Sequence, residues 1–167
     1  EMHNEFENLN VMLVGDLRYG RTAHSLSHAL ARFNVNLTLV SPESLKMPRE
    51  IVDDLLALGC NVTETDNLYE NIKDSDVIYM TRIQKERFPD EDEYTKVSGI
   101  YKLSKTDLVG SKENMIIMHP LPRVNEIHPS VDSTKHARYF QQAFNGIPTR
   151  MALLCKSLGI DIEKEVA

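Results

Sequence analysis

Three segments of the sequence carry residues that are suited to binding a small anion. In the first, residues 79–87, Arg82, Gln84 and Glu86 follow the apolar run 76–79. Arginine presents a planar fork that can take a carboxylate through two parallel hydrogen bonds. Gln84 lies two residues beyond Arg82, so an extended backbone would point both side chains the same way. Glu86 is placed to hold an arginine in position; a solvated charged loop is the alternative interpretation.

The second segment is the turn at residues 15–22, which joins an expected strand to an expected helix. Its glycine spacing is that of a phosphate-binding P-loop, but Arg21 stands where such a loop requires lysine. The strand at 76–80 also lacks a terminal aspartate placed for Mg²⁺. Gly20 and Arg21 nevertheless open a helix, where backbone N–H groups and the helix dipole favour an anion. A tight turn with a surface arginine is the alternative.

The third segment is His119-Pro120-Leu121-Pro122. Its two prolines remove two N–H donors and fix φ, so the backbone there is expected to be stiff and extended. Such a backbone presents carbonyl oxygens, which suit a ligand that carries N–H groups, such as an amide or a carbamoyl group. A rigid loop that only turns the chain is the alternative.

The elements that would position these segments alternate between apolar runs and amphipathic stretches. This alternation predicts a Rossmann-like three-layer α/β/α fold with a mainly parallel sheet of about five strands. Strands are expected at residues 11–15, 36–40, 61–63, 76–80 and 115–118, and helices at residues 20–33, 48–58, 67–73 and 105–110. Ligands bind at the carboxyl ends of strands in such sheets. Arg21, Arg82, Gln84 and the carbonyls of Pro120 and Leu121 are therefore expected to meet at one rim.

Two stretches outside the expected sheet have open interpretations. Residues 88–93 are acidic and contain a proline, which is typical of a mobile lid loop, and a helical turn is expected at residues 94–99. Residues 134–158 have a helical pattern that is expected to break near residues 146–148 and to stop at Gly159. The wide apolar surface of this last helix either caps the sheet or packs on a domain outside the chain. Its aromatic residues are expected in the core: Tyr139, Phe140 and Phe144.

Length and composition exclude several classes of protein. The chain has 167 residues, 41% of them hydrophobic, and a net charge of −6, which suits one domain and disfavours a nucleic-acid partner. No apolar run approaches the ~18 residues of a membrane span. No Cys/His group has metal-ligand spacing, and Cys60 and Cys155 are expected to be reduced thiols. The histidines are interpreted as capping or surface residues: His24, His28, His119, His128 and His136.

Together, the three segments resemble the carboxy-terminal, aspartate-binding half of the aspartate transcarbamoylases, from about Leu9 to Leu158. The glutamine-containing segment at residues 139–143 and Asn145-Gly146 also match. The resemblance implies transfer of the carbamoyl group of carbamoyl phosphate to L-aspartate, which gives N-carbamoyl-L-aspartate and phosphate in pyrimidine biosynthesis. It implies no cofactor and no metal. It further implies a cytoplasmic homotrimer of full-length chains, with regulatory chains in some members.

The resemblance also implies roles for individual residues. Arg21, Arg82 and Gln84 would bind the carboxylates of L-aspartate, and Glu86 would orient Arg82. Backbone groups of three residues would hold the carbamoyl group of carbamoyl phosphate: Pro120, Leu121 and Pro122. When the domains close, Glu93 in the acidic loop would pair with a residue of the first turn, either Arg18 or Tyr19. Ornithine transcarbamoylases usually have cysteine in place of proline in the His-Pro-Leu-Pro motif, so Pro120 favours aspartate.

The sequence departs from the family in one large respect. The Ser-Thr-Arg-Thr-Arg phosphate loop, the histidine that polarises the carbamoyl group and a lysine from a neighbouring subunit belong to an amino-terminal half, and none is found in this sequence. We therefore expect residues 1–167 to form a single amino-acid-binding domain without the carbamoyl-phosphate domain, and to be nearly inactive alone. A dicarboxylate-binding module without chemistry and a degenerate nucleotide-binding domain remain the alternatives.

Overall fold

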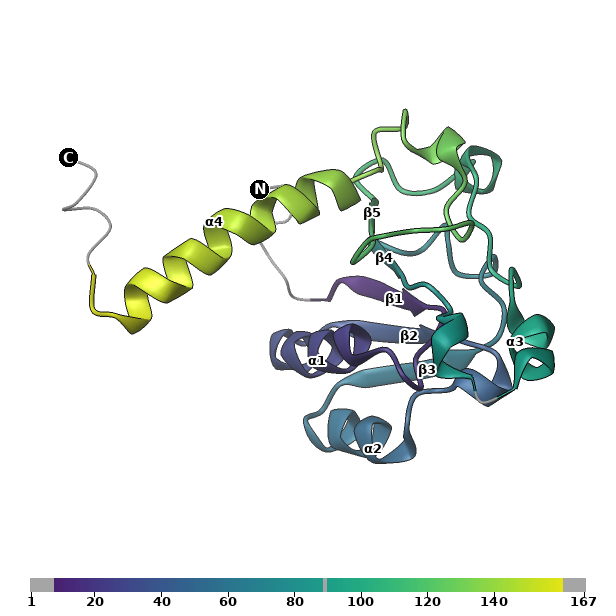
Figure 1. The fold of residues 1–167 in the computed structure, drawn as a ribbon, viewed down its shortest axis with the longest axis horizontal. Coiled ribbons are helices and arrows are strands. Elements are labelled where there is room, and N and C mark those ends of the chain that lie inside the picture. The colour runs from purple at the N-terminus through teal and green to yellow at the C-terminus, as the bar shows by residue number, and fades with distance from the viewer. Residues whose placement is uncertain (1–7, 89, 161–167) are drawn as a thin grey trace.

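A five-stranded parallel sheet forms the centre of the molecule (Figure 1). The computed structural model describes residues 8–88 and 90–160. The strands follow the order β3-β2-β1-β4-β5 across the sheet. Their bounds are Asn10–Val14 for β1, Asn36–Val40 for β2, Asn61–Thr65 for β3, Val77–Met80 for β4 and Ile116–Met118 for β5. Every pairing is parallel, which confirms the expected Rossmann-like fold.

The central strand β1 is buried on both faces, which explains its uninterrupted apolar sequence. On one face Leu13 packs in a cluster that the helices α1 (Arg21–Leu30) and α2 (Arg49–Ala57) cover, with the 3₁₀ helices Ala31–Phe33 and Glu43–Leu45 beside them. On the other face Met12 packs in a cluster built largely from turns and short 3₁₀ helices. Those helices are Lys105–Leu108 and Pro129–Val131.

The helix predicted at residues 67–73 is wrong, because this segment consists of turns. The Asn67 side chain accepts a hydrogen bond from the Tyr69 N–H, and the Thr65 hydroxyl accepts one from the Asn67 N–H. Such local side-chain bonds give the backbone an alternative to helical hydrogen bonding. Leu68 and Ile72 are still buried, so the apolar pattern reports burial here and not a helix.

The predicted acidic loop is partly helical. Helix α3 runs from Glu91 to Val97, and Asp90 caps it by accepting a hydrogen bond from the Asp92 N–H. Acidic side chains in the first turn are favourable because they face the positive end of the helix dipole. A loop prediction from acidity alone therefore missed a capped helix, and the turn expected at residues 94–99 is the end of it.

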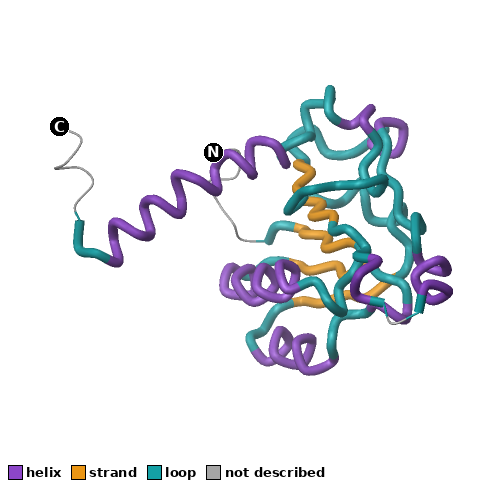
Figure 2. The backbone as a smooth tube through the Cα atoms, in the orientation of Figure 1, coloured by secondary structure: helices purple, strands orange, loops and turns teal. Residues whose placement is uncertain are grey.

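The last helix, α4 (Tyr139–Ser157), is continuous through Pro148, so the predicted break is wrong. It projects away from the sheet, as Figures 1 and 2 show, and so does not cap it. Tyr139 is fully buried as predicted, whereas Phe140 and Phe144 are 55% and 65% exposed, contrary to prediction. The physical reason is that α4 projects away from the body of the domain, and Tyr139 is its only buried residue. The exposed apolar residues beyond it are Ile147, Met151, Leu153, Leu154 and Leu158.

Within the described residues, no helix has the length and apolar character that spanning a membrane requires. Those same residues contain no group of three or more His, Cys, Asp or Glu side chains arranged to hold a metal ion. Cys60 is buried and Cys155 is half-buried, and both are free thiols.

The ends of β1 and β4 are joined by a close backbone approach. Thr81 donates a hydrogen bond from its N–H and another from its hydroxyl to the Val14 carbonyl, at 2.8 Å each. The same hydroxyl accepts from the Asp16 N–H at 3.1 Å. Gly15 lies between these contacts with φ +117°, and a Cβ atom there would lie 2.5 Å from the Thr81 carbonyl oxygen. Only glycine fits this position, and its absence of a side chain sets the distance between the two strand ends.

We predict that Gly15→Ala destabilises the domain by at least about 3 kcal/mol, because it adds both a backbone clash and a strained φ. Gly59→Ala is the matched control. Gly59 also has positive φ, +81°, but has no atom within 4 Å of the added Cβ. Strain alone should cost about 1 kcal/mol there. Urea unfolding of both variants measures the difference, and equal costs would show that the close approach to Thr81 contributes nothing.

Candidate functional site

A hollow of about 70 Å³ lies at the carboxyl edge of the sheet, where three strands end. Each strand end contributes part of its lining. Asp16, Gly20 and Thr22 follow β1; Thr81, Arg82 and Gln84 follow β4; His119, Pro120, Leu121 and Pro122 follow β5. The structure therefore brings all three predicted segments to one rim, as the parallel topology requires.

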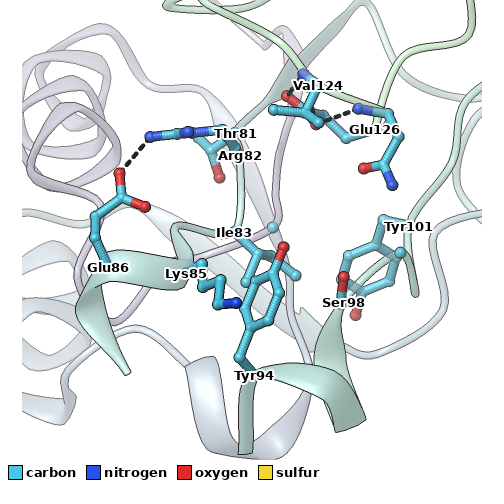
Figure 3. Close-up of a pocket in the computed structure, with 13 residues that line it drawn as sticks. Thr81, Arg82, Ile83, Lys85, Glu86, Tyr94, Ser98, Tyr101, Val124 and Glu126 are labelled. Atoms are coloured by element: carbon cyan, nitrogen blue, oxygen red, sulfur yellow. Dashed lines mark hydrogen bonds and ion pairs between the residues drawn. The ribbon is translucent and has the colours of Figure 1, made fainter. Parts of the chain in front are cut away.

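Arg82 supplies the positive charge in the lining of this hollow. Its Nη2 donates a hydrogen bond to Glu86 Oε1 at 2.6 Å, and its side chain is 29% exposed (Figure 3). A backbone N–H hydrogen bond and the Arg82 guanidinium hold the pKa of Glu86 below its ordinary value. Glu86 is therefore charged at neutral pH and restrains the arginine. Among the described residues, Glu86 is the one hydrogen-bond partner of the Arg82 side chain, so its remaining N–H groups can reach a ligand.

The 119–122 segment is held by a buried histidine. His119 Nδ1 accepts from the Leu121 N–H at 2.8 Å, so Nε2 carries the proton and donates to Glu126 Oε1 at 2.7 Å. Both side chains are buried, so His119 is not a surface residue, and of the two expected roles its ring has the capping one, toward the Leu121 N–H. Leu121 has φ +48° and a cis peptide bond to Pro122. The histidine thereby fixes a backbone conformation that few residues adopt.

Glu126 is the charged partner of this histidine. Burial raises the pKa of Glu126, but the His119 ring and nearby backbone N–H groups outweigh that effect and hold it below its ordinary value. Its carboxylate accepts from the N–H groups of Val124 and Asn125 as well as from His119. Glu126 was not singled out in the sequence, because an acidic residue in a loop gives no sign that it is buried.

A second set of hydrogen bonds connects the strand ends through side chains of α1, β4 and α4. Gln142, in the first turn of α4, accepts a hydrogen bond from the His119 N–H at 3.0 Å. The buried Tyr79 hydroxyl bonds the side chains of Thr22 and Gln142, although burial raises the pKa of Tyr79. One tyrosine thus links α1, β4 and α4 beneath the hollow. The sequence signal for this role was the glutamine-containing segment at residues 139–143.

Asp16 is a buried carboxyl in the lining that sequence reasoning also missed. Burial raises its pKa, and hydrogen bonds from the backbone of Tyr19 and Arg18 oppose this. Its Oδ1 accepts from the Tyr19 N–H at 2.9 Å. An aspartate that bonds its own backbone three residues on is a common turn feature, and this local pattern was available in the sequence.

Some expected site residues are not gathered in the hollow. Arg21 is exposed and its side chain is not part of the lining, although its neighbours Gly20 and Thr22 are. Arg18 lies over the Tyr19 ring at 5.3 Å and donates to the Ser44 carbonyl at 3.3 Å. Glu93 is in the first turn of α3, with no hydrogen bond or ion pair to Arg18 or Tyr19 in the described chain. The roles of these residues stay predictions.

A second hollow, also of about 70 Å³, lies on the other side of Arg82 and is drawn in Figure 3. Helix α3 borders it through Tyr94, whose ring packs edge-on against Phe88 at 5.6 Å. Lys85 forms an ion pair with Glu91 and so ties the short 3₁₀ helix Lys85–Arg87 to α3. Arg82 lines both hollows, and in the second it shares the lining with Tyr94 of α3.

The same domain is found in known proteins. A family model described as the Asp/Orn binding domain of aspartate/ornithine carbamoyltransferase matches residues 7–156. The aspartate carbamoyltransferase catalytic subunit of Methanocella arvoryzae is 57% identical over 154 residues, which are 92% of this chain and 50% of that subunit. The catalytic subunit of Thermococcus kodakarensis is 55% identical over 156 residues, which are 93% of this chain and 50% of that subunit.

Solved structures agree with these relatives. The catalytic subunit of M. jannaschii aspartate transcarbamoylase superposes with a TM-score of 0.83 at 49% identity, over 91% of this chain and 50% of that one. Aspartate transcarbamoylase from Trypanosoma cruzi, in complex with carbamoyl phosphate and aspartate, superposes with a TM-score of 0.83 at 36% identity. The superposition covers 90% of this chain and 50% of that one. The chain spans about half the length of the curated relatives it matches. It belongs to the aspartate/ornithine carbamoyltransferase family and corresponds to the Asp/Orn binding domain of that family.

Proposed function

We propose that this domain binds L-aspartate as part of an aspartate carbamoyltransferase active site. The complete site would transfer the carbamoyl group of carbamoyl phosphate to L-aspartate, giving N-carbamoyl-L-aspartate and phosphate for pyrimidine biosynthesis. The observation that carries this proposal is the meeting of Arg82 and Gln84 with the 119–122 backbone in one hollow. The Trypanosoma cruzi structure, which contains both carbamoyl phosphate and aspartate, supports the same pair of substrates.

The reaction requires the domain mainly to position the two reactants. The uncharged amine of L-aspartate attacks the carbamoyl carbon, a C–N bond forms, the C–O bond to phosphate breaks, and the departing phosphate takes the proton that the amine loses. Arg82 and Gln84 would hold one carboxylate of the amino acid, and Arg21 at the rim would hold the other. Carbonyl or other backbone groups of Pro120, Leu121 and Pro122 would bind the carbamoyl group. Such placement of two reactants supplies much of the rate enhancement in reactions of this type.

A second domain is part of the proposal. The exposed apolar residues of α4 would be covered by it, because an exposed patch of this extent is typical of an interaction site. The residues that bind phosphate would come from that domain. Assembly as a homotrimer of full-length chains, association with regulatory chains and a cytoplasmic location are supported by the family resemblance alone.

The two alternatives make different demands on the site. A dicarboxylate-binding module without chemistry needs only the hollow around Arg82. A nucleotide-binding domain needs far more space, since small-molecule and cofactor pockets are typically about 300–1,000 Å³, whereas this hollow is about 70 Å³. The size of the hollow therefore favours a small amino acid over a nucleotide.

Arg82→Ala tests the proposed aspartate site. It should weaken binding of L-aspartate and of succinate by roughly 2–5 kcal/mol, the range for removing one partner of a desolvated charge pair. Calorimetry on this chain measures the change. Arg49→Ala is the control, because Arg49 is exposed on α2 and pairs with Asp53 of the same helix. Equal affinity in the Arg82 variant and the wild type would show that Arg82 is a surface residue.

Reconstitution tests whether the domain takes part in catalysis. Alone, the chain should form no N-carbamoyl-L-aspartate above background, because it contributes no phosphate site of the family type. Adding the separately purified amino-terminal half of the Methanocella arvoryzae relative should produce activity, measured as carbamoyl-aspartate formed. Met151→Glu on the apolar face of α4 is the matched variant and should prevent the gain by weakening association. Aspartate binding without any gain on reconstitution would favour the module without chemistry.

A further inference from the structure

Gln84 lies between two arginines that follow β4. Arg82 precedes it in the lining of the hollow, and Arg87 follows it in the 3₁₀ helix Lys85–Arg87. Arg87 Nε donates a hydrogen bond to Gln84 Oε1 at 2.6 Å, and the Arg87 N–H donates to the Gln84 carbonyl at 3.1 Å. The side chain and the backbone of one residue therefore both fix Gln84.

This contact settles which end of the Gln84 amide faces Arg87 and which end is left for the hollow that Gln84 lines. A guanidinium group has five N–H donors and no acceptor, so only the amide oxygen can face Arg87. The Gln84 NH₂ group is then directed away from Arg87, and it has no hydrogen-bond partner among the described residues. Arg82 also presents only donors. A ligand in the hollow therefore meets two neighbouring donor groups, one charged and one neutral.

Two adjacent donors require two adjacent acceptors in the ligand. A carboxylate has two acceptor oxygens, whereas a carboxamide of the same shape has one oxygen and one NH₂ group. If the oxygen of a carboxamide faces Arg82, its NH₂ group faces the NH₂ group of Gln84, and two buried donors are left unpaired. Sites with fixed hydrogen-bonding groups reject such mismatched analogues strongly.

We infer that Arg87 is a positioning residue that determines specificity, because it fixes Gln84 as a donor and so selects a side-chain carboxylate over a carboxamide. This inference rests on the proposed binding of L-aspartate, with its side-chain carboxylate at Arg82 and Gln84. Without Arg87 the Gln84 amide is free to turn over and present its oxygen to the ligand. The glutamine alone, which can donate or accept, does not distinguish the two ligands.

A second observation places Arg87 beside the hollow. The buried Asp16 carboxyl is part of the lining; burial raises its pKa, and the Arg87 charge is among the influences that lower it. The guanidinium therefore acts on a lining residue that follows β1 as well as on Gln84. Lys85, in the same 3₁₀ helix, pairs instead with Glu91 of α3 and makes no hydrogen bond to Gln84.

The test compares L-aspartate with L-asparagine, which differ only in the side-chain carboxylate and carboxamide. Affinities for both are measured on this 167-residue chain by titration of amide NMR spectra, which detects weak binding. The ratio of the two affinities is the readout. Arg87→Met should lower the preference for aspartate about tenfold, the scale for one mismatched hydrogen bond to a charged or fixed group. A residue with only a structural role would weaken both ligands equally and leave the ratio unchanged.

Three further variants test whether the orientation of the Gln84 amide sets the preference for aspartate. Arg87→Lys keeps a cationic donor and should restore most of the preference for aspartate. Lys85→Met removes a charge from the same 3₁₀ helix without touching Gln84, so the ratio should stay at the wild-type value. Gln84→Glu replaces the donor NH₂ group by an acceptor and should lose the preference even with Arg87 present. Unchanged amide spectra away from the hollow would show that each variant is folded.

The outcomes separate this inference from the proposed function. A ratio that Arg87→Met leaves unchanged, while Arg82→Ala abolishes aspartate binding, overturns the role of Arg87 and leaves the aspartate site intact. An equal loss in Lys85→Met shows that net charge, and not amide orientation, sets the preference, and also overturns it. No binding of either L-aspartate or succinate to the wild-type chain overturns both.

Discussion

The close approach of Gly15 and Thr81 is the constraint on which the site depends. Hydrogen bonds from Thr81 to Val14, and from Asp16 to Thr81, join the end of β1 to the end of β4. This contact places the turn after β1 next to Arg82, and the Tyr79 hydroxyl with Gln142 adds the end of β5. The hollow is therefore shaped by backbone contacts that any larger residue at position 15 would disrupt.

The parallel sheet and the rim could be predicted because both follow from regular patterns. Strand β1 is buried on both faces, so its apolar run is continuous and stands out. In parallel strands every carboxyl end lies at the same edge, so polar residues after β1, β4 and β5 must meet. Glu86 was expected to hold one of the arginines, and the contact with Arg82 that the family resemblance implied is present at 2.6 Å.

The features that the sequence did not predict depend on contacts that a sequence pattern does not show. His119 looked like one of several scattered histidines until its ring was found between the Leu121 N–H and Glu126. The turns near Asn67 follow from local side-chain hydrogen bonds that compete with a helix. Phe140 and Phe144 have the apolar spacing of core residues, but both are exposed on α4, which projects away from the sheet (Figure 1). In each case the tertiary arrangement outweighed the local signal.

The polar groups of the site have two roles: some hold other side chains in place, and others are left to contact the ligand. Glu86 and Glu126 are both held in their charged forms, and each restrains another group, Arg82 in one case and the His119 ring in the other. The ligand is left to face donors from Arg82 and Gln84 on one side and backbone groups of residues 119–122 on the other. This arrangement fits a carboxylate next to a group that carries N–H, as the carbamoyl transfer would require.

A crystal structure of this chain with L-aspartate bound tests the central claim most directly. We predict a carboxylate whose two oxygens contact the Arg82 guanidinium and the Gln84 NH₂ group, within the hollow bordered by residues 119–122. Density for L-aspartate at another surface, with the hollow unchanged, would contradict it.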